Sequence, residues 1–303
     1  MRFLVLSLVL AVTCPMAAVS ADAALEFPEI RGVTRETRTY KKVGGTNLAM
    51  TICFPPGHAD TDKRPAIVFF FGGGWTSGTP TQFERQCEYL ASRGMVAMMA
   101  DYRVKSRHGV APDACVMDAK SAIRWTRANA AHLGIDPNRI VAAGGSAGGH
   151  IAAATGTVEG YDEKGEDTAV SSVPNAMVLF NPALNTTAAG WGDDKRGAGL
   201  VARFAGHAEE LSPVHHVKKG VPPTLILHGT ADATVPFAQA EAFTEAMHTA
   251  GNRCEVIRYE GQGHGFFNAS KGGEKNFLAT LAEADTFLAS LGYLKGQPTI
   301  VAD

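Results

Sequence analysis

The stretch that most constrains what this chain can fold into is residues 144–148, which read GGSAG. The apolar run before it, residues 139–143, is typical of a buried strand, and residues 151–155 continue as an apolar helix would. G-x-S-x-G between a strand and a helix predicts a sharp turn that exposes the hydroxyl of Ser146. The amide of Ala147 then lies at the helix N-terminus, where it can stabilise an oxyanion. Such pentapeptides also occur by chance in glycine-rich loops. Whether Ser146 is a catalytic nucleophile therefore depends on whether the rest of the chain supplies its partners.

Strand-like and helix-like runs alternate along the chain after an opening hairpin. Residues 39–43 and 48–54, joined across Gly44-Gly45, predict an antiparallel hairpin. Residues 66–71 (AIVFFF) do not alternate, which is typical of a strand buried on both faces. The pattern predicts an α/β fold, a three-layer sandwich around a mostly parallel eight-stranded sheet with an antiparallel N-terminal edge. The other predicted strands are residues 95–100, 139–143, 176–180, 224–227 and 254–259, and the predicted helices are residues 83–92, 113–131, 237–250, 276–291 and the run after Ser146.

The N-terminus predicts export. Arg2 precedes an apolar run that ends near Val12, and small residues lead up to Ala21, so residues 1–21 are interpreted as a signal peptide of a secreted or periplasmic protein. Pro15 breaks the run too early for a membrane anchor. Lipidation at Cys14 is a minor alternative, because the small residue usual before such a cysteine is missing. Residues 22–303 are then predicted to form a single domain, long enough to bury its own core.

Charge and cysteine content narrow the possible partners. The net charge is −2, with 28 basic and 30 acidic residues and no basic block, which argues against nucleic acid or an anionic membrane as a partner. The pair His215-His216 is more typical of a solvated turn than of a metal site, and no metal or cofactor is predicted. Four widely spaced cysteines follow the signal segment: Cys53, Cys87, Cys115 and Cys254. They could form two disulfides in any of three alternative pairings, or remain buried free thiols.

Two long stretches interrupt the alternating pattern. Residues 157–174 are polar and rich in Asp, Glu and Ser, whereas residues 185–213 are glycine-rich and carry Trp191 and Phe204. Loops of this length in a compact domain are usually lids, substrate walls or plain surface excursions. Aromatic side chains are costly to expose without purpose, so residues 185–213 are the better candidate for a lid or substrate loop.

Partners for the serine follow two later predicted strands. Asp232 comes just after the strand at 224–227, and His264 comes just after the strand at 254–259. Carboxyl ends of parallel strands gather at one sheet edge, where active sites form. A histidine alone could equally be structural, but the order Ser146, Asp232, His264 is the one that this topology requires for a nucleophile, an acid and a base. The sequence therefore predicts a catalytic triad.

A glycine run offers donors for the oxyanion that acyl transfer generates. Gly72, Gly73 and Gly74 directly follow the strand at 66–71, and without Cβ atoms their amides are open to a substrate carbonyl. A phosphate-binding loop is the competing reading, but neither G-x-G-x-x-G nor G-x-x-x-x-G-K-[ST] can be written there. Gly72, Gly73 and Gly74 together with Ala147 are the predicted oxyanion hole.

The motifs in combination resemble those of α/β-hydrolase fold serine esterases. The chain is most similar to the hormone-sensitive-lipase-like carboxylesterases and to the acetylxylan and feruloyl esterase-like branch, over roughly residues 40 to 292. The residues that carry the resemblance are 71–75 (FGGGW), 101–103 (DYR), 118–125 (DAKSAIRW), 134–140 (GIDPNRI), 144–150 (GGSAGGH) and 264–266 (HGF).

The resemblance implies Ser146 as nucleophile, His264 as general base and acid, and Asp232 as the residue that orients it. Phe71 departs from the family pattern, because a histidine that helps to hold the glycine loop usually stands there. Asp118 resembles a position that ties a helix to the sheet, and His150 and His228 are interpreted as structural. Trp75 and Trp191 are candidates for walls of an acyl or sugar pocket.

The predicted function is a secreted serine carboxylesterase that acts on short-chain esters, with acetyl or feruloyl esters of plant carbohydrate as candidate substrates by analogy. Its partners would be small-molecule or carbohydrate esters. One alternative is a peptidase of the prolyl-oligopeptidase type, whose relatives carry a large extra domain that this chain has no room for. The other is a non-catalytic hydrolase fold that binds a ligand, in which the serine or histidine is typically lost.

Overall fold

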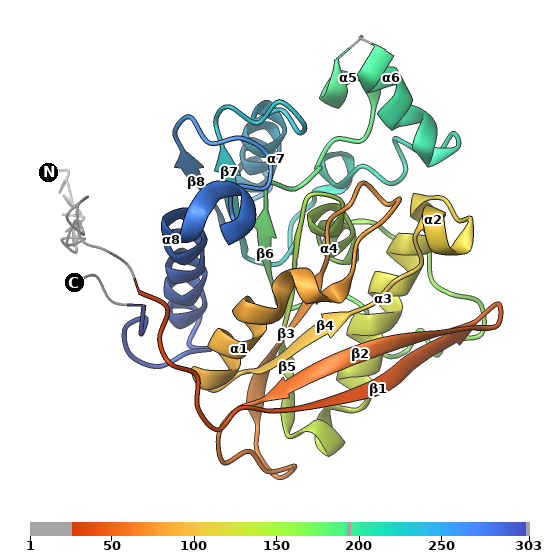
Figure 1. The fold of residues 1–303 in the computed structure, drawn as a ribbon. Helices are drawn as coiled ribbons and strands as arrows, with labels where there is room; N and C mark the ends of the chain where they lie inside the picture. Colours follow the sequence, from red (N-terminus) through yellow and green to blue (C-terminus); the bar gives the residue numbers. More distant parts are fainter. Residues whose placement is uncertain (1–25, 193–194, 301–303) are drawn as a thin grey trace, which may run out of the picture.

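The computed structural model describes residues 26–192 and 195–300, so the predicted signal segment, residues 1–21, lies outside the described residues. One eight-stranded sheet runs through the molecule in the order β1-β2-β4-β3-β5-β6-β7-β8 (Figure 1). The first two strand pairs, β1–β2 and β2–β4, are antiparallel, and the remaining neighbours are parallel. This confirms the predicted fold class.

The bounds of the elements agree closely with the sequence pattern where apolar runs are long. The strands are β1 (Thr34–Val43), β2 (Thr46–Phe54), β3 (Arg64–Phe70), β4 (Val96–Ala100), β5 (Ile135–Gly145), β6 (Ala176–Phe180), β7 (Thr224–Gly229) and β8 (Cys254–Tyr259). The α-helices are α1 (Glu84–Ser92), α2 (Lys105–His108), α3 (Pro112–Ala128), α4 (Ala147–Thr157), α5 (Ala188–Trp191), α6 (Lys195–Val201), α7 (Ala238–Thr249) and α8 (Ala269–Ser290), and the short 3-10 helices are η1 (Pro80–Phe83), η2 (Ala130–Leu133), η3 (Ala202–Phe204) and η4 (Pro213–His216).

Three elements begin four or more residues before their predicted starts. Strand β1 begins at Thr34 because its polar first half pairs with β2 at the exposed edge of the sheet, where no apolar run is needed. Strand β5 begins at Ile135, which pairs with Arg64 ahead of an irregularity in the register. Helix α8 begins at Ala269 rather than 276, across a kink at Gly273, where φ is +79°. A kink of this kind hides the helical period from a sequence pattern.

Helices cover both faces of the sheet and form the predicted three layers. Successive residues of the central strand β3 point to opposite faces, so Val68 joins one hydrophobic core and Phe69 joins the other. Residues of α3, α4 and α7 complete the first core, and residues of α1 and α8 complete the second. Each large apolar side chain buried in this way contributes about 1.5–3 kcal/mol. The two cores fix the sheet and, with it, the positions of the loops at its edge.

The four cysteines of the described chain are all buried and unpaired. Burial raises the pKa of the Cys53 and Cys254 thiols to about 11, which keeps them protonated. The alternative of free thiols is the one that the structure adopts. No helix within residues 26–192 and 195–300 is long and apolar enough to cross a membrane.

Asp118 has the structural role that the resemblance implies. Its carboxylate is fully buried in α3 and accepts a hydrogen bond of 2.6 Å from Lys41 Nζ and one of 2.9 Å from the backbone amide of Arg103, whose guanidinium it also binds. The edge strand β1, the segment after β4 and helix α3 are thereby joined.

Candidate active site

The turn at Ser146 has the strained geometry that its motif predicts. Ser146 lies between β5 and α4 with φ of +55°, a conformation that costs a non-glycine residue about 1–3 kcal/mol. Its amide donates to the carbonyl of Phe180 on β6 at 2.9 Å, which fixes the turn to the neighbouring strand. The close approach of α4 to β3 requires glycine at position 148, since a Cβ there would lie 2.1 Å from the carbonyl oxygen of Phe70. The fold therefore holds the Ser146 hydroxyl outward.

Ser146, His264 and Asp232 meet in one chain of hydrogen bonds at the carboxyl edge of the sheet. The Nε2 atom of His264 lies 2.9 Å from Ser146 Oγ, and its Nδ1 atom lies 2.7 Å from Asp232 Oδ2. The other carboxylate oxygen of Asp232 accepts hydrogen bonds from the amides of Thr234 and Val235 at 2.7 and 2.8 Å. The structure brings together the three residues that the sequence predicts, with the imidazole between the hydroxyl and the carboxylate.

A second histidine, which the sequence analysis did not assign to the site, also contacts Asp232. His228 is the last residue but one of β7 and is fully buried. Its Nε2 lies 3.2 Å from Asp232 Oδ2 and 3.1 Å from the carbonyl oxygen of Val235. Burial alone would raise the pKa of Asp232, but the hydrogen bonds from His228 and His264 and from the Val235 amide hold this pKa well below its usual range. The carboxylate therefore stays ionised and fixed behind the His264 imidazole. No local sequence signal indicates this contact, because it depends on how the chain turns after β7.

Three of the four predicted oxyanion donors keep an amide without an acceptor in the described chain: Gly73 and Gly74 in the glycine loop, and Ala147 at the start of α4. The amide of Gly72 already donates to Gln82 Oε1 at 2.6 Å, so Gly72 anchors the loop and is not available as a donor. Gly73 and Gly74 have no acceptor for their amides among the described residues, and both line the pocket around Ser146. Gly73 has φ of +131°, and a Cβ there would lie 2.0 Å from the carbonyl oxygen of Ser77, so only glycine fits. Ala147, at the first position of α4, has an amide that no earlier turn of the helix can satisfy.

Phe71 holds the loop by stacking, without the side-chain hydrogen bond of the usual histidine. Its ring stacks on Tyr102 with 4.1 Å between centroids, and Tyr102 Oη donates to the Phe71 carbonyl at 2.6 Å. Gln82 continues the support, because its Nε2 donates to Asn268 Oδ1 at 3.1 Å and Asn268 Nδ2 donates to the Gly265 carbonyl at 2.9 Å. The glycine loop and the loop after His264 are thus joined by side-chain amides.

Trp75 and His150 form a buried connection beneath the pocket. The indole Nε1 of Trp75 donates to His150 Nδ1 at 3.1 Å, and His150 Nε2 donates to the carbonyl of Leu211 at 2.7 Å. Burial lowers the pKa of His150 to about 4, against the opposing effect of the Leu211 hydrogen bond, so the ring is neutral. The indole packs edge-on against Phe204 and is 3% exposed. Trp75 lines the pocket but has mainly structural contacts, and His150 is structural as predicted.

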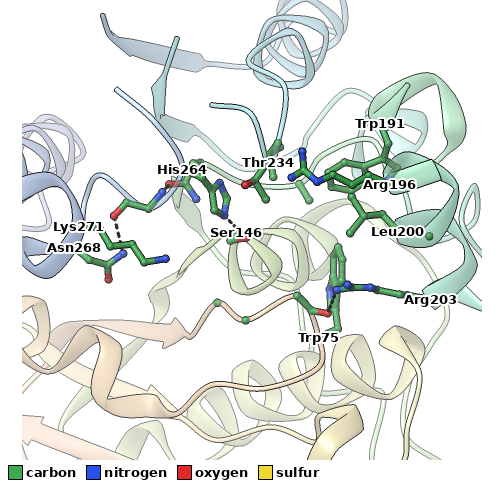
Figure 2. A pocket seen from close by; sticks show the side chains of 18 of the residues that line it. Trp75, Ser146, Trp191, Arg196, Leu200, Arg203, Thr234, His264, Asn268 and Lys271 are labelled. Carbon is green, nitrogen blue, oxygen red and sulfur yellow. Dashed lines mark hydrogen bonds between the residues drawn. The ribbon is translucent and has the colours of Figure 1, made fainter. Parts of the chain in front are cut away.

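Residues 185–213 form one wall of the pocket. Helices α5 and α6 rise above the sheet edge in Figure 1, and the short helix η3 follows them. Trp191, at the end of α5, is 9% exposed and lines the pocket, and its Nε1 has no hydrogen-bond partner among the described residues. Figure 2 shows Trp191 and Leu200 on one side of Ser146 and Asn268 on the other. The pocket has a volume of about 590 Å³.

His215 and His216 lie in η4 away from the pocket lining. Within the described part of the chain, no group of three His, Cys, Asp or Glu residues is placed to hold a metal ion.

Comparisons with known proteins identify the family. The model of the family described as BD-FAE matches residues 50–247. Esterase LipC of Mycobacterium tuberculosis is 32% identical over 231 residues, which cover 68% of this chain and 54% of LipC. Together with the fold and the arrangement around Ser146, these matches show an α/β-hydrolase of the esterase class, and the chain belongs to the BD-FAE family. It spans about half the length of the curated relatives that it matches.

Solved structures of esterase 2 from Thermogutta terrifontis are similar over nearly their whole length. The form phosphoramylated by tabun is 50% identical with a TM-score of 0.82 and covers 89% of this chain and 98% of its own. The propionate-bound form is 51% identical and the butyrate-bound form 50%, each with a TM-score of 0.81 and the same coverage. The similarity supports the sequence-based resemblance to hormone-sensitive-lipase-like esterases.

Proposed function

We propose that this protein is a serine carboxylesterase that hydrolyses short-chain esters through an acyl-enzyme on Ser146. The observation that carries the proposal is the unbroken series of contacts from Ser146 Oγ through His264 to Asp232, beside unpaired amides of the glycine loop. A serine hydroxyl is a weak nucleophile by itself and needs a base within hydrogen-bond reach.

In the first half of the reaction, Ser146 Oγ attacks the ester carbonyl carbon while His264 Nε2 takes the hydroxyl proton. Asp232 stabilises the resulting imidazolium, and the amides of Gly73, Gly74 and Ala147 receive the developing oxyanion. Each such donor is worth about 3 kcal/mol of barrier. The imidazolium then gives its proton to the leaving alcohol oxygen as the C–O bond breaks, which leaves an acyl ester on Ser146.

In the second half, His264 removes a proton from water, and the hydroxide attacks the acyl carbon. The proton returns to Ser146 Oγ as the acyl–enzyme bond breaks, and the free acid is released. No atom is left over, so each cycle consumes one ester and one water and yields one alcohol and one acid.

Short acyl groups suit the pocket. Trp191 and Leu200 supply an apolar wall, while the helices above it are short and no larger cap lies in the described chain. Esterase 2 of Thermogutta terrifontis has been solved with propionate and with butyrate bound, which supports the same size class. Within the proposal, the signal segment makes the protein secreted or periplasmic, and acetyl or feruloyl esters of plant carbohydrate are its candidate substrates.

The proposal is tested with the variant Ser146→Ala. We expect the hydrolysis of p-nitrophenyl acetate and butyrate to fall by at least about a thousandfold, because only the oxyanion donors and substrate binding remain. Ser106→Ala, which removes an exposed hydroxyl on α2, is the matched control and should have the wild-type rate. Parallel assays with octanoate and acetylated xylan define acyl length and alcohol. Activity of Ser146→Ala within tenfold of wild type would refute the assignment.

A further inference from the structure

Among the described residues, the charged side chains that line the pocket around Ser146 all carry the same sign. No aspartate or glutamate belongs to the described lining, although the whole chain has slightly more acidic than basic residues. The cations of the lining are Lys195, Arg196, Arg203 and Lys271. Like charges gathered in one hollow repel one another and raise the local concentration of anions.

Two of these cations are held on the wall formed by residues 185–213. Arg203 Nη1 donates to the carbonyl of Gly74 at 2.9 Å, and Arg196 donates to the carbonyl of Ala233. A carbonyl oxygen orients a guanidinium but does not neutralise it, and each arginine keeps further N–H donors for a ligand. Both side chains are exposed and form no ion pair with any described residue.

Lys271 lies on the opposite side of the pocket, next to the catalytic histidine loop. Its chain passes over Gly265, where a Cβ would lie 2.9 Å from Lys271 Cδ and 3.4 Å from Nζ. The ammonium has no hydrogen-bond or ion-pair partner among the described residues. Figure 2 shows Lys271 on one side of Ser146 and Arg196 and Arg203 on the other. A small ligand at Ser146 is therefore flanked by cations.

From this arrangement we infer that the substrate is an ester that itself carries a negative charge, a carboxylate being the simplest case. The inference rests on the proposed function, since it specifies the substrate of the same site. A carboxylate bound by exposed lysine or arginine side chains gains a modest interaction from each pair. Several pairs on two sides of the pocket would make the charge a determinant of specificity.

The space beside Lys271 indicates where the charged part can lie. A second, adjoining groove of about 550 Å³ shares Gly72, Gln82, Asn268 and Lys271 with the pocket. Hydroxyl groups of Thr79, Thr81 and Ser270 continue its lining. The charged side chains that also line it, Glu84 and Arg85, are already paired with Arg35 and Glu274. Because the leaving alcohol must receive its proton from His264, a polar alcohol that bears a carboxylate fits this side. A charged acyl group would instead lie toward Arg196 and Arg203.

Matched substrates separate the two placements. For the acyl side, we compare p-nitrophenyl hemisuccinate with p-nitrophenyl butyrate, which has the same chain length and no charge. For the alcohol side, we compare acetylated glucuronic acid with acetylated glucose. The measured quantity is the ratio of kcat/KM for the charged substrate to kcat/KM for the neutral one, at low salt. We expect the ratio to exceed one for at least one pair and to fall as salt is added.

Single variants show which cation binds the negative charge of the substrate. Lys271→Gln should lower the alcohol-side ratio by about fivefold, and Arg196→Gln should lower the acyl-side ratio by a similar factor, from the typical strength of an exposed ion pair. Asp193 and Asp194 precede Arg196 in sequence and lie outside the described residues. Lys271 is remote from both in sequence, so Lys271→Gln is the clearer test of the two variants. Lys219→Gln, an exposed lysine away from the pocket, is the control and should leave both ratios unchanged.

The outcomes distinguish this inference from the proposed function. If wild type hydrolyses the neutral esters but both ratios stay at or below one, or neither variant lowers a ratio, the inference is wrong while the esterase proposal stands. If wild type hydrolyses none of the four esters, or Ser146→Ala retains hydrolysis, the proposed function itself fails. A ratio above one that Lys271→Gln or Arg196→Gln reduces, with Lys219→Gln unchanged, supports a negatively charged ester.

Discussion

The two long irregular segments, residues 157–174 and 185–213, differ in what their charges contact. Carboxylates of the first segment bind cations of the domain body: Glu163 pairs with Lys41 and Arg103 at 2.8 Å, and Asp162 and Glu166 pair with Arg124. The lysine and arginine side chains of the second segment, Lys195, Arg196 and Arg203, form no ion pair within the described chain and line the pocket instead. The first segment fastens the outer face of α3, whereas the second forms a wall of the site.

Their positions in the chain account for the difference. Residues 157–174 connect helix α4 to strand β6, and so lead back to the amino end of a strand. Residues 185–213 leave the carboxyl end of β6, the edge at which Ser146 and His264 lie. In open parallel sheets, ligands bind at the carboxyl edge. Whether a long segment follows a strand or a helix is therefore a better guide to its role than its composition.

The largest expected effect comes from the ion cluster that the first segment completes. In Asp118→Asn, the charges of Lys41 and Arg103 keep only Glu163 as a partner while Lys41 stays buried. We expect the free energy of unfolding to fall by about 3–5 kcal/mol, measured by urea denaturation. Asp113→Asn on the same helix, which forms no ion pair in the described chain, is the control. A loss below about 1 kcal/mol would contradict the assigned role of this cluster.

An intermediate effect is expected at His150, which connects the end of the second segment to helix α4 through Leu211. Burial holds the pKa of His150 at about 4, below its ordinary value of 6.5, so the unfolded chain binds a proton that the folded chain does not. The contribution of neutral His150 to the free energy of unfolding is therefore fully present above about pH 6.5 and is lost as the pH falls toward 4. Between about pH 7 and pH 4.5 we expect His150 to account for a loss of about 2–3 kcal/mol.

The measurement is urea denaturation at several pH values in wild type and in His150→Gln, whose amide can both donate and accept a hydrogen bond. The variant should show a shallower decline of stability with acid. If the free energy of unfolding changes equally with pH in the two proteins, the protonation of His150 does not affect stability and this prediction is wrong.

The smallest effects test the comparison most directly, with one variant from each segment. Glu163→Gln should lower the free energy of unfolding by about 1 kcal/mol, because the carboxylate is partly exposed, and leave kcat/KM unchanged. Arg203→Gln should lower kcat/KM by about fivefold, since it removes a donor to the Gly74 carbonyl, and change stability by less than about 0.5 kcal/mol. The comparison is wrong if Glu163→Gln lowers kcat/KM and Arg203→Gln lowers the free energy of unfolding.

Apolar runs and motif order were enough to predict most of the fold. Strands β6 and β8 begin and end at the predicted residues because their apolar or alternating runs stop abruptly at turn residues. The hydrogen-bonded contact of Ser146, His264 and Asp232 also follows from order alone, because parallel strands bring their following loops to one edge. These features depend on the local pattern of each element and on the order of the elements along the chain.

Long-range side-chain contacts could not be predicted in the same way. Helices α5 and α6 lie in a glycine-rich segment without an apolar period, and their positions depend on packing against the rest of the domain. The hydrogen bond from Gly72 to Gln82 removes one predicted oxyanion donor, and nothing local to either residue indicates it. The contact of His228 with Asp232 depends likewise on how the chain turns after β7.

The side-chain amides of Gln82 and Asn268 have a consequence for how the site meets its substrate. They join the glycine loop to the loop after His264, and Asn181 Oδ1 accepts a further hydrogen bond from the Gly265 amide at 3.0 Å. All these bonds exist before any ester arrives. Under the proposed mechanism, the oxyanion donors and His264 are therefore held in position before the substrate binds, and little reorganisation energy is needed when charge develops on the substrate. The free energy needed to order these loops is supplied once, when the chain folds, and does not have to be supplied again in each catalytic cycle.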